Sequence, residues 1–224
     1  MPPTLAPSPL RSSTTSCPSN EAGAFALVKP SREHLESYVA ALERGWSPDN
    51  VREETRIEQL HLIASDPQAF LSSLDDREAK SGPIRLADGS FVARLPGFRR
   101  WMWDGDFAGT IGLRWQPGTS ALPPWCLGHI GYGVVPWKRR RGYATAALRL
   151  ILPVARSEGL VYVELTTEEE NVPSQRVILA NGGVCVGGFE KSTVHGDLAG
   201  LRFRIDLAGE EPAEAAQKRS PCVP

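Results

Sequence analysis

The chain lacks any apolar run near the roughly 18 residues that a membrane-spanning helix needs, which argues against a transmembrane segment. Its N-terminus also lacks the basic n-region and the continuous apolar h-region of a signal peptide. Its 25 Lys and Arg residues nearly balance its 26 Asp and Glu residues, so no overall field favours a polyanion or a membrane surface. We therefore expect a cytoplasmic protein that binds neither membranes nor nucleic acid.

Cysteine is also scarce, with four residues: Cys17, Cys126, Cys185 and Cys222. They lie far apart and form no CxxC pair, which argues for reduced thiols rather than a disulfide framework or a zinc site. The histidines His34, His61 and His195 show no ligand spacing. We therefore expect no metal.

The two ends of the chain differ in composition from its middle. Residues 1–22 are rich in Pro, Ser and Thr, and residues 209–224 are polar and contain Pro, so we expect a disordered leader and a disordered tail. The remaining residues, 23–208, have the length of one domain.

Hydrophobic periodicity predicts strands and helices in alternation along that domain. Strands are expected at 24–30, on either side of Asp104-Gly105, and at 126–135, 160–167, 184–191 and 199–207. Helices are expected at 32–44, 51–65, 67–74, 142–159 and 172–182, with a long loop that carries hairpin signals at 75–96. This order predicts an α/β (α+β) fold, with a mixed sheet flanked by helices.

The most informative stretch is "GHIGYGVVPWKRRRGYATAALRLIL", residues 128–152. Glycine weakens a strand unless something must approach the backbone closely, and this strand is rich in glycine. An Arg-x-x-Gly-x-Ala loop follows, formed by Arg139, Gly142 and Ala144. Small residues at a helix start expose N–H groups that have no internal partner, so we predict a diphosphate cradle. It is neither the GxxxxGK[ST] loop nor the GxGxxG fingerprint.

The cations from Lys138 to Arg141 leave alternatives open. A solvated loop would need only water, and a nucleic-acid site would need aromatic interleaving or an extended basic face, which the stretch lacks. In the cradle, only Arg139 and the backbone need touch phosphate, while Lys138 or Arg140 meets either a 3′-phosphate or water.

The region 24–207 resembles the GNAT superfamily of acyl-CoA-dependent N-acyltransferases, and most of all its RimJ/RimL-like and related bacterial branches. The stretch quoted above resembles that family's fourth strand, pyrophosphate loop and third helix, and "LVYVELTTEEENVPSQRVILANGG" resembles its fifth strand, Asn-bearing turn and fourth helix. The resemblance implies a mostly antiparallel sheet of about seven strands flanked by about four helices. It also implies that the parallel fourth and fifth strands splay apart to admit pantetheine.

The resemblance further implies acetyl-CoA as co-substrate. The Val134 N–H would polarise the thioester carbonyl, the amides from Arg139 to Thr145 would hold the diphosphate, and Asn171 and Ser174 would lie near the thiol arm. The implied contacts are Val134, Val135, Arg139, Arg140, Arg141, Gly142, Tyr143, Ala144, Thr145, Asn171 and Ser174.

The chain departs from the family at both usual catalytic positions. Ile178 stands where many members carry a proton-donating Tyr, and Gly128 stands where some carry a Glu base. The remaining candidates for proton transfer are His129, Tyr132 and Glu164. Side chains alternate along a strand, so His129 and Tyr132 point to opposite faces. We favour Tyr132 as donor to the thiol, the alternative being that its ring packs under the cofactor while water carries the protons.

Two functions follow from these observations. The first is an N-acetyltransferase that acts on a primary amine of a small molecule or a protein N-terminus, by direct attack in a ternary complex. The second is a CoA-binding regulatory module without catalysis, motivated by Gly128 and Ile178. The sequence does not name the acceptor.

Two further features bear on partners. The tryptophans Trp101, Trp103 and Trp115 on the expected hairpin either pack in the core or form an acceptor platform, and an exposed hairpin would allow a homodimer. The acidic stretch from Thr167 to Asn171 either attracts a cationic amine or is simply solvated.

Overall fold

The computed structural model describes residues 24–49, 54–86, 88–189 and 200–207. The expected leader (1–22) and the expected tail (209–224) lie outside these residues, as do Cys17, His195 and Cys222. Within the described ranges, no helix is both long enough and apolar enough to cross a bilayer.

The elements follow the order expected from the sequence. The helices are α1 (Arg32–Glu43), α2 (Glu54–Ser65), α3 (Pro67–Ser73), α4 (Tyr143–Ser157) and α5 (Val172–Leu179), with a 3-10 turn η1 (Pro136–Lys138). The strands are β1 (Ala26–Val28), β2 (Asp75–Asp76), β3 (Ile84–Arg85), β4 (Phe91–Val92), β5 (Gly97–Trp103), β6 (Phe107–Arg114), β7 (Ile130–Val134), β8 (Tyr162–Thr167), β9 (Val184–Phe189) and β10 (Gly200–Asp206).

The strands form two main sheets. The first has the order β1-β5-β6-β7, with β2 paired to β5, and the second has the order β8-β10-β9. All of these pairings are antiparallel. The hairpin signals at 75–96 produce the small ribbon β3-β4. The mixed α/β architecture predicted from the sequence is therefore confirmed.

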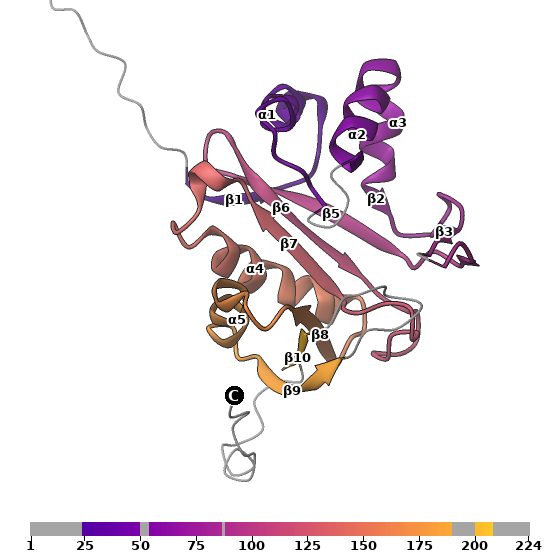
Figure 1. Ribbon diagram of the computed structural model, residues 1–224, viewed down its shortest axis with the longest axis vertical. Helices are drawn as coiled ribbons and strands as arrows, with labels where there is room; N and C mark the ends of the chain where they lie inside the picture. The colour runs from indigo at the N-terminus through magenta and orange to yellow at the C-terminus, as the bar shows by residue number, and fades with distance from the viewer. Residues whose placement is uncertain (1–23, 50–53, 87, 190–199, 208–224) are drawn as a thin grey trace, which may run out of the picture.

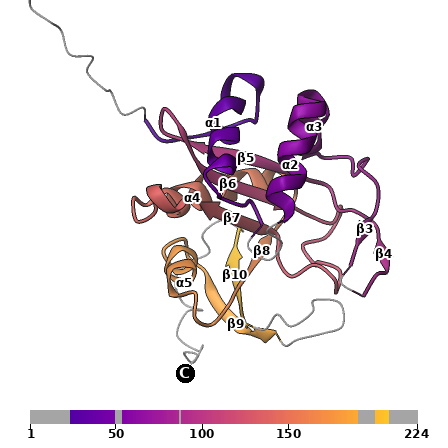
Figure 2. The same cartoon turned by 45° about the horizontal axis from the view of Figure 1, so that its top comes forward.

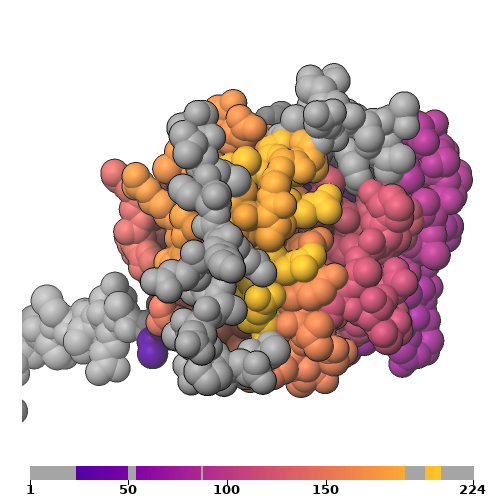
Figure 3. Space-filling view, turned by 90° about the horizontal axis from the view of Figure 1, so that it is seen from below, coloured from indigo at the N-terminus to yellow at the C-terminus, as the bar shows by residue number. Residues whose placement is uncertain are grey.

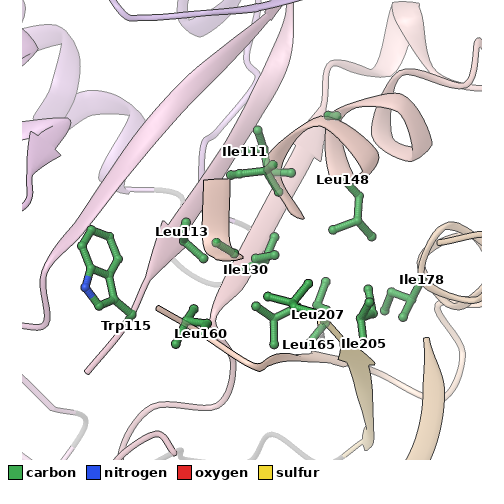
Figure 4. Packing of buried hydrophobic residues seen from close by; sticks show 14 of the residues in the cluster. Ile111, Leu113, Trp115, Ile130, Leu148, Leu160, Leu165, Ile178, Ile205 and Leu207 are labelled. Atoms are coloured by element: carbon green, nitrogen blue, oxygen red, sulfur yellow. The ribbon is translucent and has the colours of Figure 1, made fainter. Parts of the chain in front are cut away.

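Helices cover the first sheet on both faces (Figure 1). One face carries Ile111 and Ile130, which pack with Leu148 and Ile151 of α4, and Figure 4 shows several members of this cluster. The other face carries Trp101, whose ring stacks on Tyr38 of α1 with the centroids 4.6 Å apart. Both clusters follow from the alternation of side chains along β5, β6 and β7.

The tryptophans pack in these cores. Trp101 is fully buried and Trp115 is 6% exposed, while Trp103 lies half-buried against the α1 cluster. The packing interpretation is therefore correct for the first two, and the suggestion of an exposed tryptophan hairpin that joins a partner is wrong for them.

The two main sheets share the α4 core, and backbone groups of β7's N-terminal end bond β8 at His129. The His129 N–H donates to the Glu164 carbonyl at 2.8 Å, and the Glu164 N–H donates back to His129 Nδ1 at 2.9 Å. Beyond this junction no strand pairing links β7 to β8 among the described residues. Figure 2 shows the second sheet continuing from the β7 edge with α5 beside it, and Figure 3 shows its orange and yellow residues from below.

Candidate cofactor and acceptor site

The opening between β7 and β8 exposes backbone groups of β7. The Arg114 N–H donates to the His129 carbonyl at 2.9 Å, and the Val135 N–H donates to the Ala108 carbonyl at 3.0 Å. In an antiparallel pair, successive residues turn their backbone groups to alternate sides. The odd-numbered residues of β7 therefore face β6, and the N–H groups of Tyr132 and Val134 face the opening.

The closed end of this opening is built around a glycine. A Cβ at Gly128 would lie 3.1 Å from the Glu164 carbonyl oxygen and 3.4 Å from the Leu165 Cα. Real Cβ atoms rarely come this close to backbone, so a longer side chain here would push β7 and β8 apart. This contact gives a physical reason for Gly128 where some GNAT members carry a base.

The two acid–base candidates at the junction are both engaged. His129 is fully buried and its Nδ1 accepts from β8; burial lowers the pKa of its ring to about 4, with the charge of Arg114 acting in the same direction. Glu164 is 8% exposed, and its carboxylate binds Arg204 at 2.8 Å and Arg202 at 3.9 Å. These contacts join β7, β8 and β10.

The loop after β7 leaves a series of backbone N–H groups free. Arg140 and Gly142 both have left-handed backbones, with φ of 62° and 80°. The first loop or α4 amide after Arg139 to donate to a described backbone oxygen is that of Ala146, which bonds Gly142. The six amides from Arg140 to Thr145 thus have no acceptor among the described residues. Six such donors at a helix N-terminus are suited to binding an anion.

The four cations of this loop have different partners. Lys138 is 9% exposed and forms an ion pair with Asp104 at 2.5 Å, so it is not available to a 3′-phosphate. The Arg139 Nε donates to the Val134 carbonyl at 3.2 Å and so links the loop to the end of β7. Arg140 and Arg141 are exposed and have no partner in the described part of the chain.

Tyr132 reaches from β7 to the start of α5. Its hydroxyl lies 2.9 Å from Ser174 Oγ and donates to the Ser174 carbonyl at 3.3 Å. Burial raises the pKa of Tyr132, and the hydrogen bond to Ser174 opposes that rise. Asn171 caps α5, because its Oδ1 accepts from the Ser174 N–H at 3.2 Å. Ile178 of α5 is fully buried in the core and has no hydroxyl. The phenol hydroxyl beside α5 is that of Tyr132, which reaches it from β7.

A cleft of about 640 Å³ lies along the first sheet and reaches the junction with β8. Its lining includes Arg99 and Arg114, the backbone around Gly131 and Tyr132, and Thr166 of β8. No local pattern in the sequence indicates this cleft, although strand pairing places Arg99 and Arg114 on the same face of the first sheet. Glu168, Glu169 and Glu170 are exposed and do not line it. In the described ranges, no three His, Cys, Asp or Glu side chains gather as metal ligands.

Comparison with protein families gives one match over most of the chain. The model of the acetyltransferase (GNAT) domain matches residues 27–184. No curated protein sequence matches significantly.

Solved structures share the fold at low sequence identity. RimJ of Mycobacterium smegmatis, in complex with CoA-disulfide, is 21% identical with a TM-score of 0.56, and the match covers 83% of each chain. The microcin C7 self-immunity acetyltransferase MccE, in complex with acetyl-CoA and AMP, is 14% identical with a TM-score of 0.53, over 81% of this chain and 92% of MccE. Spermidine N-acetyltransferase from Vibrio cholerae, with CoA and spermine, is 13% identical with a TM-score of 0.50, over 82% and 95%.

Proposed function

Because this chain belongs to the GNAT acetyltransferase family, we propose that it transfers the acetyl group of acetyl-CoA to a primary amine of a small molecule or a protein N-terminus. Family membership makes the chain an acetyl-CoA-dependent acyltransferase. The observation that carries the proposal is the row of backbone N–H groups from Arg140 to Thr145, which find no acceptor in the part of the chain that the structure describes and directly follow β7.

These amides support binding of the CoA diphosphate. Each N–H at a helix start is an unsatisfied donor, and the helix dipole adds partial positive charge at the same place. The left-handed Arg140 and Gly142 turn the loop so that its successive amides precede α4 without internal bonds. Arg139, Arg140, Arg141, Tyr143 and Ala144 belong to this proposed cradle, while Asn171 and Ser174 belong to the proposed thiol side.

The backbone of β7 that faces the opening supports the acyl-transfer step. The free amine attacks the thioester carbonyl carbon after its ammonium form has lost a proton to solvent. The Val134 N–H, which faces the opening, donates to the oxyanion that forms on the carbonyl oxygen. Val135 is already bonded to Ala108, so we assign it a supporting role in holding the strand end.

Tyr132 supports the last step. When the carbon–sulfur bond breaks, the thiolate takes the Tyr132 hydroxyl proton, and the proton lost by the attacking nitrogen restores the hydroxyl through solvent. The raised pKa of Tyr132 keeps the hydroxyl protonated at neutral pH. We propose Tyr132 for this role rather than His129 or Glu164, because those two are held in the junction by β8 and β10.

The test is a matched pair of glycine substitutions. Gly142→Glu introduces a carboxylate into the cradle, whereas Gly118→Glu changes a glycine with nearly the same left-handed φ, 78° against 80°, in a loop outside it. Neither glycine has an atom within 4 Å of an added Cβ, so the backbone cost of about 1–2 kcal/mol is shared. We expect calorimetry to show that acetyl-CoA binds at least about tenfold more weakly to Gly142→Glu alone.

The outcome also separates the two functions left open by the sequence. Equal acetyl-CoA affinity in both variants would contradict the cradle. Tight binding of acetyl-CoA without release of free CoA in the presence of any amine of a broad panel would instead indicate a regulatory CoA-binding module.

A further inference from the structure

The cleft beside the opening has a floor of small residues and a cationic wall. Gly112 of β6 pairs with both Arg99 of β5 and Gly131 of β7, so these three residues share one face of the sheet. Arg114 lies two residues along β6 from Gly112 and therefore points to the same face. This face is the one opposite α4, since Leu113 and Ile130, of the other parity, pack in the α4 core. Two guanidinium groups thus border one stretch of bare backbone.

Neither of these two arginines has a close acceptor in the described part of the protein, although the charges of Tyr38 and Asp49 act on Arg99. Neither Arg99 nor Arg114 forms a side-chain hydrogen bond or ion pair there, whereas Arg100 binds Asp75 at 3.5 Å and Arg94 donates to the Gly82 carbonyl at 3.0 Å. Among residues 24–49, 54–86, 88–189 and 200–207, the fold therefore supplies hydrogen-bond acceptors to Arg94 and Arg100 and none to Arg99 and Arg114. A pair of free guanidinium groups is suited to bidentate binding of an anionic oxygen group.

The surroundings of Arg99 support this interpretation. Its side chain is exposed where it borders the cleft; desolvation lowers the pKa of its guanidinium, and the positive charge of Arg114 lowers it further. The charge of Asp49 at the cleft edge acts in the opposite direction. Two like charges held near each other attract a shared counter-ion, because a bound anion relieves their repulsion.

The position of the pair relates it to the proposed chemistry. The Arg114 guanidinium lies 3.5 Å from where a Cβ of Gly131 would be. Val134, whose N–H faces the opening, is three residues further along the strand, a distance of about 10 Å. A ligand whose acid group binds the arginines therefore has its other end within several ångströms of the proposed reaction centre.

We propose that the acceptor is a small amine that carries a carboxylate or a phosphate, and that Arg99 and Arg114 bind this anionic group. The inference rests on the proposed acetyl transfer and names its substrate class. Both acids present the oxygen atoms that a guanidinium fork matches, and the experiment separates them. A polycation such as spermine, present in the Vibrio cholerae structure, would be repelled by the same wall.

The experiment measures release of free CoA with matched amines. The pairs are γ-aminobutyrate with butylamine, and phosphoethanolamine with ethanolamine, with spermidine as the polycation. We expect kcat/KM to be at least about tenfold higher for one acidic member than for its neutral partner, as for a charge-assisted contact. The pair that shows the difference identifies carboxylate or phosphate.

Variants then link the preference to the two arginines. Arg99→Gln and Arg114→Gln should each raise KM for the acidic amine about tenfold or more, with kcat and neutral-amine turnover little changed. Arg156→Gln is the matched control: this exposed arginine of α4 lies about 20 Å along the helix from its start. Arg99→Lys should recover part of the affinity, since it keeps the charge but not the fork.

Some outcomes would contradict the anionic acceptor and leave the proposed acetyl transfer intact. Equal or faster acetylation of butylamine, ethanolamine or spermidine would do so, as would unchanged selectivity in both arginine variants. If no amine turns over, titration of phosphoethanolamine and γ-aminobutyrate into the protein tests the anion site directly, and absent binding or unchanged binding in Arg99→Gln contradicts it. Failure of acetyl-CoA itself to bind would instead contradict the proposed function.

Discussion

Tyr132→Phe is the substitution that most directly tests the proposed mechanism. It removes one oxygen and keeps the ring, so the packing of the half-buried side chain on the α4 core is retained. The lost contact with Ser174, at 2.9 Å, should reduce the free energy of unfolding by about 1 kcal/mol. A change of this size leaves the protein folded.

The expected effect on turnover is larger than the effect on stability. General acid catalysis contributes roughly 10²–10⁴-fold. A thiol of pKa about 8.5 is a fair leaving group near neutral pH, so the effect should lie at the low end of that range. We therefore expect kcat to fall about 100-fold, equivalent to about 2.7 kcal/mol of transition-state stabilisation, with acetyl-CoA affinity unchanged.

The assay compares two Tyr→Phe variants. Release of free CoA gives kcat, and calorimetry gives the acetyl-CoA affinity of each variant. Tyr162→Phe is the control, because the ring of Tyr162, on β8, packs beneath the guanidinium of Arg204, on β10, with 3.9 Å between the guanidinium carbon and the ring centroid. A kcat within about twofold of wild type in Tyr132→Phe would refute the assignment and favour water as the proton carrier.

The remaining predictions concern the scaffold. The pKa of His129 is about 4 in the folded protein and 6.5 in the unfolded chain. The neutral ring therefore contributes fully to the free energy of unfolding above pH 6.5, and this contribution decreases by about 3 kcal/mol as the pH falls to 4. Urea titrations should show that the free energy of unfolding falls more steeply with decreasing pH in wild type than in His129→Asn. Lys138→Met removes the ion pair of the half-buried Asp104 carboxylate, which keeps its hydrogen bond from Tyr143, and should lower the unfolding free energy by about 1–2 kcal/mol; a loss under about 0.5 kcal/mol would contradict the ion pair. Gly128→Ala places a methyl 3.1 Å from the Glu164 carbonyl and should destabilise by about 1–2 kcal/mol in thermal unfolding; a stabilised variant would show that the junction has room.

The order of helices and strands could be predicted from the sequence because each element has a local sequence signal. The periodicity of α4, the cap at Asn171 and the Asp104-Gly105 turn depend on neighbours within a few residues along the chain. The candidate diphosphate loop was accessible for the same reason, since a helix start and its small residues are contiguous.

Contacts between residues that lie far apart in the chain could not be predicted from the sequence. In the sequence, Lys138 is one of four consecutive cations that no local pattern distinguishes. In the structure, its side chain forms an ion pair with Asp104 on the β5–β6 turn and is buried there. The sequence favours core packing of the hairpin tryptophans over an acceptor platform, but it does not name their neighbours. The stacking of Trp101 on Tyr38 of α1 comes from the tertiary structure alone. Such pairings depend on how separate elements pack, which no local pattern encodes.

The sequence alone determined the fold family and indicated the loop that we propose for the diphosphate, because the strand, loop and helix signals are local in the chain. The tertiary structure alone decided that Tyr132 reaches Ser174, that His129 and Glu164 fasten the two sheets, and that Arg99 and Arg114 open onto one cleft. These facts depend on where β5 to β8 and α5 come together in space, since each of the groups involved acquires its role only from a neighbour on another element.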